Sequence, residues 1–235
     1  RYLPVGWDEA FQTIGSHLRA LPDPNMADFY TSGRTSNEAA FLYQVFVREY
    51  GTNNFPDCSN MCHEATSVGL PQSIGIGKGT VSLDDFDHCD LMLFFGQNTG
   101  TNSPRFLHPI QQAVKRGCKI VTFNPIRERG LIEFTNPQSP TEMLSRRGTP
   151  ISDLYLQLRP GGDIAAIAGI CKHLLEIGSV DRDFIAEHGH DFDAFETWIR
   201  ASSWDDIEAA SGLPRTDLVE VAEIVAASQR VIGIY

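Results

Sequence analysis

The sequence predicts an α/β fold with a doubly wound, mainly parallel sheet, joined to an N-terminal helix–strand–helix piece of a second, discontinuous domain. Three strand-length segments support this prediction: Leu91–Phe95, Lys119–Phe123 and Leu154–Leu158. The first is wholly apolar, which is typical of a parallel strand covered on both faces. Segments with helical spacing of apolar residues follow the first and the third, and alternating strands and helices indicate a parallel sheet.

The composition is that of an acidic globular protein. The chain has 235 residues, of which 42% are hydrophobic, and a net charge of −11. This charge disfavours general binding to nucleic acid or to anionic membranes, since both need basic surface. No apolar run approaches the roughly 20 residues of a membrane helix, and the first residues lack the apolar core of a signal peptide. The five cysteines show no disulfide spacing, so we expect a cytoplasmic protein.

The N-terminal part predicts a helix, a short strand and a second helix. Asp8 is a candidate N-cap for the first helix, which ends at Pro22. The strand would be Met26–Tyr30. Thr35 and Glu38 have the spacing of a capping box, which would begin the second helix. The residues expected to face inward from that helix are Phe41, Val45 and Tyr50.

A polar loop, Asn53–Leu70, contains the most reactive group of side chains, namely Cys58, Cys62 and His63. A thiolate is a soft metal ligand and an imidazole carries a proton near neutral pH, so the adjacent Cys62 and His63 suit a metal-centred redox site. Three alternative roles compete with this one. Cys62 could be a small buried core residue, the cysteines could bind structural zinc although a second ligand pair is missing, or Cys58 and Cys62 could form a disulfide.

The glycines of Gly75–Gly79 do not indicate a dinucleotide-binding loop. They follow a predicted helix, Thr66–Ile74, whereas a phosphate-binding fingerprint follows a strand and begins a helix. We therefore interpret them as a flexible turn, and no glycine fingerprint supports a nicotinamide dehydrogenase.

The loop after the first predicted strand is a candidate phosphate site. Ser103 is expected to cap a helix that begins at Pro104 and buries Ile110, Ala113 and Val114. A loop between the carboxyl end of a strand and a helix N-terminus presents unpaired N–H groups to a phosphate. The cofactor-binding candidates here are Gly96, Gln97, Asn98, Asn102 and Ser103. The alternative is an ordinary connection between a strand and a helix.

Two further loops carry candidates. Asn124 follows the second strand, where an acidic residue commonly holds a ribose hydroxyl, and Arg127 could stack on or pair with a nucleotide. The alternative is that both are solvated loop residues. Residues 133–153 have the composition of a long surface excursion. After the third strand, Arg159–Gly162 forms a loop and Asp163 is the expected N-cap of a helix.

That helix is expected to bury six residues: Ile164, Ile167, Ala168, Cys171, Leu174 and Leu175. Between Asp181 and Ser211 we expect short helices whose aromatic residues pack inside, with His188 and His190 at the surface. A last helix begins near Pro214 and leads to a strand at Val231. Residues 1–60 are thus assigned to part of a discontinuous domain and residues 64–235 to a doubly wound domain.

Several motifs in order resemble the molybdopterin oxidoreductases related to formate dehydrogenase. They are WDEAF, SGRTSNEAA, the Cys62-His63 pair, GQNTGTNSP, FNPIRERG and LRPGGDIA. The resemblance implies that Cys62 ligates molybdenum, that His63 accepts a proton, and that Gly162 and Asp163 contact the guanine of the cofactor, where a carboxylate can accept two N–H groups. Formate dehydrogenases usually continue the Cys-His pair with Gly-Pro, and this chain has Glu64-Ala65 instead.

The resemblance also implies the rest of the assembly. The cofactor would be molybdenum bis(molybdopterin guanine dinucleotide), bound by residues 64–235. The chain begins without Met and ends on an apolar segment, so we expect part of a longer oxidoreductase that acts on a small-molecule substrate and passes electrons to a partner. A [4Fe-4S] cluster would have its ligands outside this chain. The other function to consider is a non-catalytic module that binds a nucleotide cofactor or a partner subunit.

Overall fold

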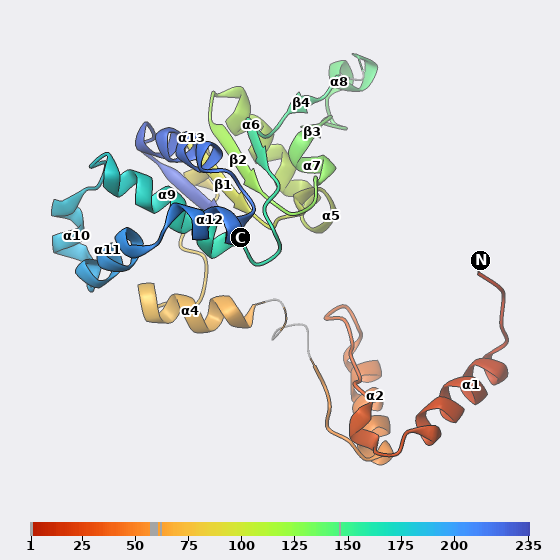
Figure 1. Cartoon of the computed structure of the whole chain (residues 1–235). Coiled ribbons are helices and arrows are strands. Elements are labelled where there is room, and N and C mark those ends of the chain that lie inside the picture. Colours follow the sequence, from red (N-terminus) through yellow and green to blue (C-terminus); the bar gives the residue numbers. More distant parts are fainter. Residues whose placement is uncertain (1, 57–60, 62, 146) are drawn as a thin grey trace. The chain divides into compact units, whose positions relative to one another are not determined.

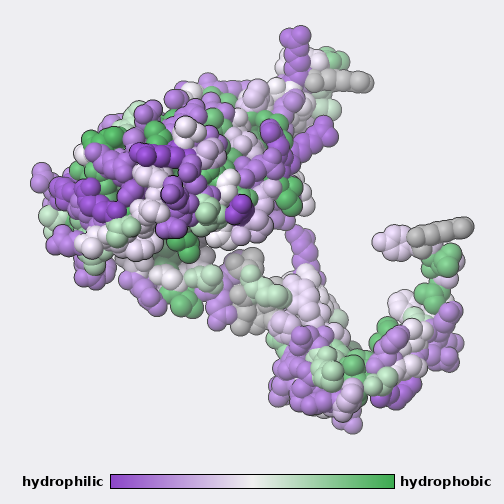
Figure 2. Space-filling view, viewed as in Figure 1, coloured by the Kyte–Doolittle hydropathy of each residue, from purple (hydrophilic) through white to green (hydrophobic). Residues whose placement is uncertain are grey.

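The computed structural model describes residues 2–56, 61, 63–145 and 147–235 (Figure 1). The chain divides into two compact units, Arg1–Thr80 and Val81–Tyr235. The assignment of residues 1–60 and 64–235 to two domains stays a prediction. Hydrophilic residues cover most of the visible surface of the second unit (Figure 2), in keeping with the acidic composition. Among the described helices, none is long and apolar enough to cross a membrane.

The first unit is helical. It contains α1 (Trp7–Ala20), α2 (Asn37–Tyr50) and α4 (Glu64–Ile74). The expected strand Met26–Tyr30 is wrong: its first residue ends a short 3-10 helix, η1 (Pro24–Met26). The segment after η1 is extended, but Phe29 donates a backbone hydrogen bond to Asn54, in a loop and not in a neighbouring strand. Extended backbone without a paired strand does not make a sheet.

Both expected helix caps in this unit are displaced. Gly6 is the N-cap of α1, and Asp8 lies in the first turn instead. Ser36 caps α2, because its hydroxyl accepts a hydrogen bond from the backbone N–H of Ala39, so the capping box that begins at Thr35 is wrong by one residue. Serine and threonine are both good caps, and the sequence alone could not decide between adjacent candidates.

The buried face of α2 also differs from the expected one. Val47 is fully buried, whereas Phe41 and Val45 are exposed. Phe29 supplies the reason, because its ring packs edge-on against those of Tyr43, Phe46 and Tyr50 at centroid distances of 5.6 to 6.0 Å. The loop that carries Phe29 thus selects which face of α2 is covered, and Tyr50 is the only one of the three expected residues on that face.

The second unit is built on a four-stranded parallel sheet, as predicted. Its strands are β1 (Leu91–Phe95), β2 (Lys119–Phe123), β5 (Leu154–Leu156) and β6 (Val231–Ile234), in the spatial order β5-β2-β1-β6. The chain moves outward from β1 to β2 and β5, then returns to the other side of β1 (Figure 1). The order therefore reverses between β1 and β6, and ligands of such sheets bind beyond the carboxyl ends of the strands near that point.

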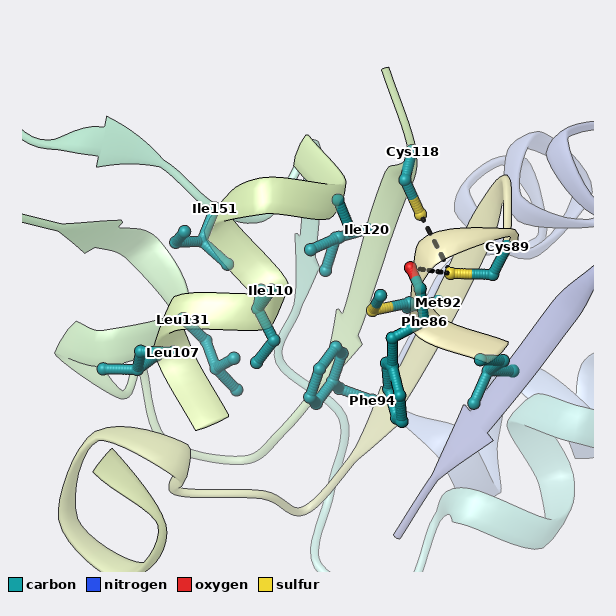
Figure 3. Packing of buried hydrophobic residues seen from close by; sticks show 12 residues of the cluster. Phe86, Cys89, Met92, Phe94, Leu107, Ile110, Cys118, Ile120, Leu131 and Ile151 are labelled. Carbon is teal, nitrogen blue, oxygen red and sulfur yellow. Dashed lines mark hydrogen bonds between the residues drawn. The ribbon is translucent and has the colours of Figure 1, made fainter. Parts of the chain in front are cut away.

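Helices cover both faces of this sheet. Helix α6 (Leu107–Lys115) packs on one face, and α9 (Asp163–Glu176), α12 (Trp204–Ser211) and α13 (Arg215–Ala226) pack on the other. Successive strand side chains point to opposite faces. The core under α6 includes Met92, Phe94, Leu107, Ile110, Ile120, Leu131 and Ile151, several of which Figure 3 shows. The core on the opposite face includes Leu91, Val121, Phe123, Ala166, Ile170, Leu218 and Val221.

The remaining elements are short and connect these layers. They are η2 (Asp84–Asp87), α5 (Thr99–Asn102), η3 (Pro104–Phe106), α7 (Arg129–Ile132), β3 (Glu133–Phe134), α8 (Pro140–Ser145), β4 (Thr149–Pro150), α10 (Arg182–His188) and α11 (Phe192–Ala201). Strands β3 and β4 pair antiparallel and carry the surface excursion expected at residues 133–153. The third predicted strand is shorter than expected, since β5 ends at Leu156.

The buried face of α9 is partly as predicted: Ala168 and Leu175 are buried, and Cys171 and Leu174 pack against the core. Ile164 and Ile167 are 71% and 43% exposed, and the small residues of the helix face inward instead. A β-carbon added at Gly169 would lie 2.8 Å from Leu218 and 3.0 Å from Ile207. Helices α12 and α13 therefore approach α9 closely, and only a face of small residues permits this contact.

The aromatic residues of α10 and α11 are also less buried than expected. Phe184, Phe195 and Trp198 are 60%, 40% and 50% exposed. Within this stretch Ile199 is buried and Phe192 packs beside it. The other expectations for the C-terminal part are confirmed: His188 and His190 are exposed, α13 buries Leu218, Val221 and Ala222, and β6 follows it.

Candidate functional site

The loops with the predicted binding residues meet at the carboxyl edge of the sheet. The loops follow β1, β2 and β5, and parallel strands place their carboxyl ends on one edge. Phe95 and Phe123, the last residues of β1 and β2, are paired in register and their rings stack at 5.0 Å. Gly96 N–H donates to the Phe123 carbonyl at 2.8 Å, and Asn124 N–H donates to Leu156 at 3.0 Å. The ladder of hydrogen bonds thus continues into the loops and holds them together.

Two glycines leave backbone uncovered at this edge. Gly96, directly after β1, has φ of 64°, and Gly161, in the loop after β5, has φ of 81°. Positive φ favours glycine in both places. A β-carbon at either position would meet no described atom within 4 Å. The backbone is therefore open to close approach by a ligand at both points.

The loop after β1 is folded differently from the prediction. Asn98 begins the short helix α5, and its side chain accepts a hydrogen bond from Thr101 N–H at 3.2 Å. Ser103 occupies the N-cap position of η3, with Pro104 as its first residue as predicted, but the Ser103 side chain makes no capping hydrogen bond. Instead of one helix from Pro104, the chain forms α5, η3 and then α6. Ile110 and Ala113 are buried on α6 as predicted.

The side chain of Thr99 is a feature of this loop that sequence reasoning missed. Thr99 is 1% exposed, and its hydroxyl oxygen has no hydrogen-bond partner among the described residues. A buried polar atom without a partner costs free energy unless a ligand or water satisfies it. Thr99 follows Asn98 and precedes the exposed Asn102 on α5, so the unsatisfied hydroxyl lies within the predicted cofactor loop.

Asn124 is buried, not solvated, and it ties two of the loops together. Its exposed fraction is 5%, and its amide Nδ2 donates to the Gln97 carbonyl at 3.0 Å. Its Oδ1 accepts from Ile126 N–H at 3.0 Å. A carboxamide has two donor and two acceptor positions. Asn124 therefore uses half of its hydrogen-bonding capacity to position the loops. The interpretation of Asn124 as a solvated loop residue is therefore wrong.

Arg127 lies over the ring of Tyr155, with its guanidinium carbon 5.4 Å from the ring centre. The Tyr155 hydroxyl donates to the Ile126 carbonyl at 2.7 Å and accepts from Glu128 N–H at 2.8 Å. Burial raises the pKa of Tyr155 above its ordinary value, so the hydroxyl stays a donor at neutral pH. The loop after β2 is thereby fastened to β5, and Arg127 is held at its rim.

The third loop is fixed against α12. Arg159 N–H donates to the Ser211 carbonyl at 2.8 Å, and its guanidinium donates to Ala209 at 2.6 Å. A β-carbon at Gly162 would lie 2.9 Å from both the Arg159 carbonyl and Ser211, so only glycine fits there. Gly162, not Asp163, is the N-cap of α9, and Asp163 makes no capping hydrogen bond. The expected cap is wrong, and the Asp163 carboxylate is not engaged with its own helix end.

A cavity of about 380 Å³ lies beside the loop after β1. Its lining includes Asn98, Gly100, Thr101, Glu128, Arg129 and Gly130. The two glycines are in direct contact, since a β-carbon on Gly130 would lie 2.8 Å from the α-carbon of Gly100. The sequence signal for this contact is weak, because a glycine in a polar loop does not reveal which distant residue it touches.

Arginine side chains lie among acidic ones at this edge, since Glu128 and Glu133 line the same cavity as Arg129. The net charge of the chain is −11, yet Arg127, Arg129 and Arg159 all lie in or beside the loops after β2 and β5. Arginine binds phosphate oxygens through paired N–H groups. The edge therefore offers open backbone, amide groups and guanidinium groups, which suit a phosphate-containing ligand.

The predicted metal ligand lies outside the described residues, as does Cys58. His63 precedes α4, is exposed and makes no capping hydrogen bond. Among the residues that the structure describes, no three His, Cys, Asp or Glu side chains cluster in a way that could hold a metal. The structural evidence on the site therefore concerns the binding edge of the second unit, and the roles of Cys62 and His63 stay predictions.

Comparison with known proteins gives one family. The family model described as molybdopterin oxidoreductase matches residues 1–225. Protein YdeP of Escherichia coli K12 is 50% identical over the whole chain, which covers 32% of that protein. The F420-dependent formate dehydrogenase 1 subunit alpha of Methanococcus maripaludis is 29% identical over 98% of the chain, which again covers 32% of the relative. The chain thus spans about a third of the length of these curated relatives.

A solved structure confirms the fold. Acetylene hydratase from Pelobacter acetylenicus matches with a TM-score of 0.60 and 20% identity, over 100% of this chain and 30% of that one. At this level of identity the likeness bears on the fold alone. The α/β class and the mainly parallel sheet predicted from the sequence agree with it.

Proposed function

Because this chain belongs to the molybdopterin oxidoreductase family, we propose that it is part of a molybdenum-dependent oxidoreductase resembling formate dehydrogenase, and that it binds bis(molybdopterin guanine dinucleotide). The observation that carries the proposal is the carboxyl edge of the sheet. There, three loops come together with open backbone at Gly96 and Gly161 and an unsatisfied buried hydroxyl at Thr99. The proposal extends beyond the family assignment in naming the guanine dinucleotide form and the residues that hold it.

The residues present fit such a ligand. A dinucleotide needs donors for its phosphates and a planar polar site for its base. The open backbone at Gly96 suits the phosphates, with Asn98, Asn102 and Ser103 in the same loop. Arg127 at the rim adds a positive charge. The carboxylate of Asp163 is not used as a cap, so it is available to accept two N–H groups of guanine beside Gly162.

The first unit would supply the reactive groups. We assign Cys62 as the sulfur ligand of the metal and His63 as the group that takes a proton from the substrate, since a neutral imidazole accepts a proton near pH 7. When bound, the cofactor would provide a centre for two-electron oxidation or reduction. The chain's own residues then bind the cofactor, orient it and hold the proton at the His63 ring. We also propose a cytoplasmic enzyme with a small-molecule substrate, an electron-transfer partner and, in the longer protein, a [4Fe-4S] cluster.

Formate is not the substrate that we favour. Glu64 directly follows His63 and is the first residue of α4. A carboxylate beside the imidazole would repel an anionic substrate. The M. maripaludis relative is a formate dehydrogenase subunit by name, but its identity of 29% leaves room for a different substrate. We therefore propose a related oxidoreductase with weak or no formate activity.

The test is an analysis of the full-length protein from a molybdate-replete host. We expect molybdenum and pterin in the purified protein, and GMP after acid hydrolysis at two equivalents per molybdenum, because a bis(guanine dinucleotide) cofactor carries two guanosine units. Protein without molybdenum and pterin would refute the assignment. Molybdenum and pterin without GMP would refute only the dinucleotide form.

The second candidate function is a module that binds a nucleotide cofactor or a partner subunit without chemistry. It is favoured by the location of the binding edge within the second unit, which contains neither Cys62 nor His63. Cys62→Ala in the full-length protein distinguishes the two functions. Loss of cofactor-dependent electron transfer with the cofactor's GMP retained supports catalysis at Cys62, and unchanged activity supports the binding role.

A further inference from the structure

The sulfur atoms of Cys89 and Cys118 lie 3.8 Å apart in the second unit (Figure 3). Cys89 comes two residues before β1, and Cys118 comes directly before β2. They are therefore at the amino ends of the central strands, on the edge of the sheet opposite the cofactor loops. Neither has a part in the proposed function.

The backbone holds the two residues at a spacing that a disulfide can bridge. Leu91 pairs in register with Lys119, so Cys118 is opposite Asp90 and one residue from Cys89 along the neighbouring strand. Lys119 N–H donates to the Asp90 carbonyl at 2.9 Å, which extends the ladder to this end. With strands about 4.8 Å apart and an offset of one residue, about 3.3 Å along the strand, the α-carbons of Cys89 and Cys118 are roughly 5.8 Å apart. Disulfides join α-carbons separated by roughly 4.4 to 6.8 Å.

Both backbone segments are fixed independently of the thiols. Cys89 N–H donates to Asp85 at 3.0 Å and Cys118 N–H donates to Ala113 at 3.0 Å. The sulfurs are 3.8 Å apart, and the bonded distance is about 2.0 Å. Side-chain rotations must therefore bring the two sulfurs about 1.8 Å closer together. Such a movement leaves the hydrogen bonds of the strands in place.

We infer that Cys89 and Cys118 are an oxidative modification site, at which a peroxide converts the two thiols into an intramolecular disulfide. The inference is independent of the proposed cofactor. One thiol, as its thiolate, attacks a peroxide oxygen, the O–O bond breaks, and a sulfenic acid and one water form. The second sulfur then attacks the first and displaces the sulfenic oxygen as a second water. Two electrons pass from the sulfurs to hydrogen peroxide, and both thiol protons end in water.

The surroundings determine how this site reacts. The residues are 8% and 6% exposed, and burial raises the pKa of both thiols, that of Cys118 to about 12. Little of either thiol is therefore present as thiolate at neutral pH. Arg116 donates to the Phe86 carbonyl, which also accepts from the Cys89 thiol, and pairs with Asp87 at 3.2 Å. Because both thiols are buried, we expect slow formation of the disulfide.

The bond has a measurable effect on stability. It would join residues 29 positions apart and restrict the unfolded chain between them. For a loop of this length we expect the melting temperature to rise by about 10 °C. Because the carboxyl edge is at the other end of the strands, the cofactor loops keep their arrangement in the oxidised form.

The experiment uses the full-length protein with Cys58, Cys62 and Cys171 replaced by serine, which leaves only the proposed pair among these 235 residues. The reduced protein is treated with hydrogen peroxide under native conditions, unreacted thiols are blocked, and the chain is digested without reduction. We expect a linked peptide containing Cys89 and Cys118 with the loss of two hydrogen atoms, its reversal by dithiothreitol, and the higher melting temperature. The matched variant Cys89→Ser should show neither the linked peptide nor the temperature shift.

Three results would overturn the inference. One is that both thiols stay free after prolonged peroxide treatment of the folded protein. Another is oxidation of each sulfur separately to sulfinic acid without a linked peptide. The third is a disulfide between two chains, visible as a dimer on a non-reducing gel. Circular dichroism of the serine variant confirms that it is folded, so that a missing bond reports chemistry and not unfolding.

Discussion

The side-chain amide of Asn124 donates a hydrogen bond of 3.0 Å to the backbone carbonyl of Gln97. The two residues follow adjacent parallel strands, so this one bond joins the first two loops of the binding edge. Asn124 also accepts from Ile126 N–H, which shapes its own loop. A buried carboxamide here has a structural function whether or not it also touches a ligand.

Asn124→Asp should destabilise the second unit by about 1–3 kcal/mol, because an unpaired buried polar group costs that much. The carboxylate keeps the acceptor for Ile126 but loses the donor to Gln97 and places negative charge against a carbonyl oxygen. Urea unfolding at pH 7 measures the loss. The matched control is Asn102→Asp, an exposed position, which should change stability by less than about 0.5 kcal/mol. Equal effects at the two sites would contradict the structural role of Asn124.

Gly130→Ala should lower stability by about 1–3 kcal/mol through overpacking. The new methyl would lie 2.8 Å from the α-carbon of Gly100, and backbone on both sides leaves little room for adjustment. The control is Gly233→Ala in β6, where no described atom lies within 4 Å of the added carbon. We expect that variant to match or slightly exceed the wild type in thermal melts. A Gly130→Ala protein as stable as wild type would show that α5 and α7 do not need this contact.

Glu142 should make stability depend on acid pH. The backbone N–H of Asn136, with Lys115 and Gln111, lowers the pKa of Glu142 from 4.5 to about 2. Because the folded pKa is depressed, the stabilisation is complete above about pH 4.5 and is lost as the pH falls toward 2. Glu142→Gln should therefore be less stable than wild type at pH 7, and the difference should shrink between pH 5 and 2.

Urea unfolding at several pH values measures this difference. The exposed Glu220→Gln on α13 controls for the general effect of removing a carboxylate and should show no such convergence. If the stability difference between Glu142→Gln and wild type stayed constant down to pH 2, the carboxylate charge would not be what holds Asn136 and residues 133–153 in place.

Asp163→Asn should separate guanine binding from helix capping. Asp163 makes no capping hydrogen bond, so removing its charge from the first turn of α9 should cost only about 0.3–1 kcal/mol. In the full-length protein we expect a clear fall in GMP retained per chain, because an amide cannot accept two guanine N–H groups. Ser203→Ala is the comparison, since Ser203 does cap α12 by accepting from Asp206 N–H at 3.0 Å. The free energy of unfolding of that variant should fall by about 1 kcal/mol, and its nucleotide content should stay unchanged.

If Asp163→Asn retains full nucleotide content after gel filtration, the guanine contact is wrong. A stability loss clearly larger than that of Ser203→Ala would instead indicate that Asp163 supports the helix.

Glu64→Gln should raise formate oxidation by the full-length enzyme if charge beside His63 is the obstacle. Glu64→Gly would restore the glycine that usually follows the Cys-His pair in formate dehydrogenases, but Glu64 begins α4, and glycine would also weaken the helix. Glutamine removes only the charge. We expect kcat/KM for formate to rise by up to about tenfold, the factor that 1.4 kcal/mol of relieved repulsion produces. Brisk formate oxidation by the unmodified enzyme with an artificial electron acceptor would refute the repulsion argument.

The sequence alone determined the class of the second unit. Leu91–Phe95 and Lys119–Phe123 were predicted with the bounds that the structure has, because an apolar run of strand length between turn residues is a local signal. The motifs of the loops likewise indicated the family from the order of residues alone. Gly162 and Asn124 could be chosen as site residues because they follow strands, and the carboxyl ends of parallel strands share one edge.

Only the tertiary structure decided which surfaces meet. The inward face of α2 depends on Phe29, and the inward face of α9 depends on how closely Leu218 and Ile207 approach Gly169. Helical spacing fixes a stripe of residues but not the partner that covers it. The same holds for the contact of Gly100 with Gly130 and for the two sulfurs of Cys89 and Cys118. The two members of each pair are about thirty residues apart in the chain. The packing of the sheet and its helices brings them together.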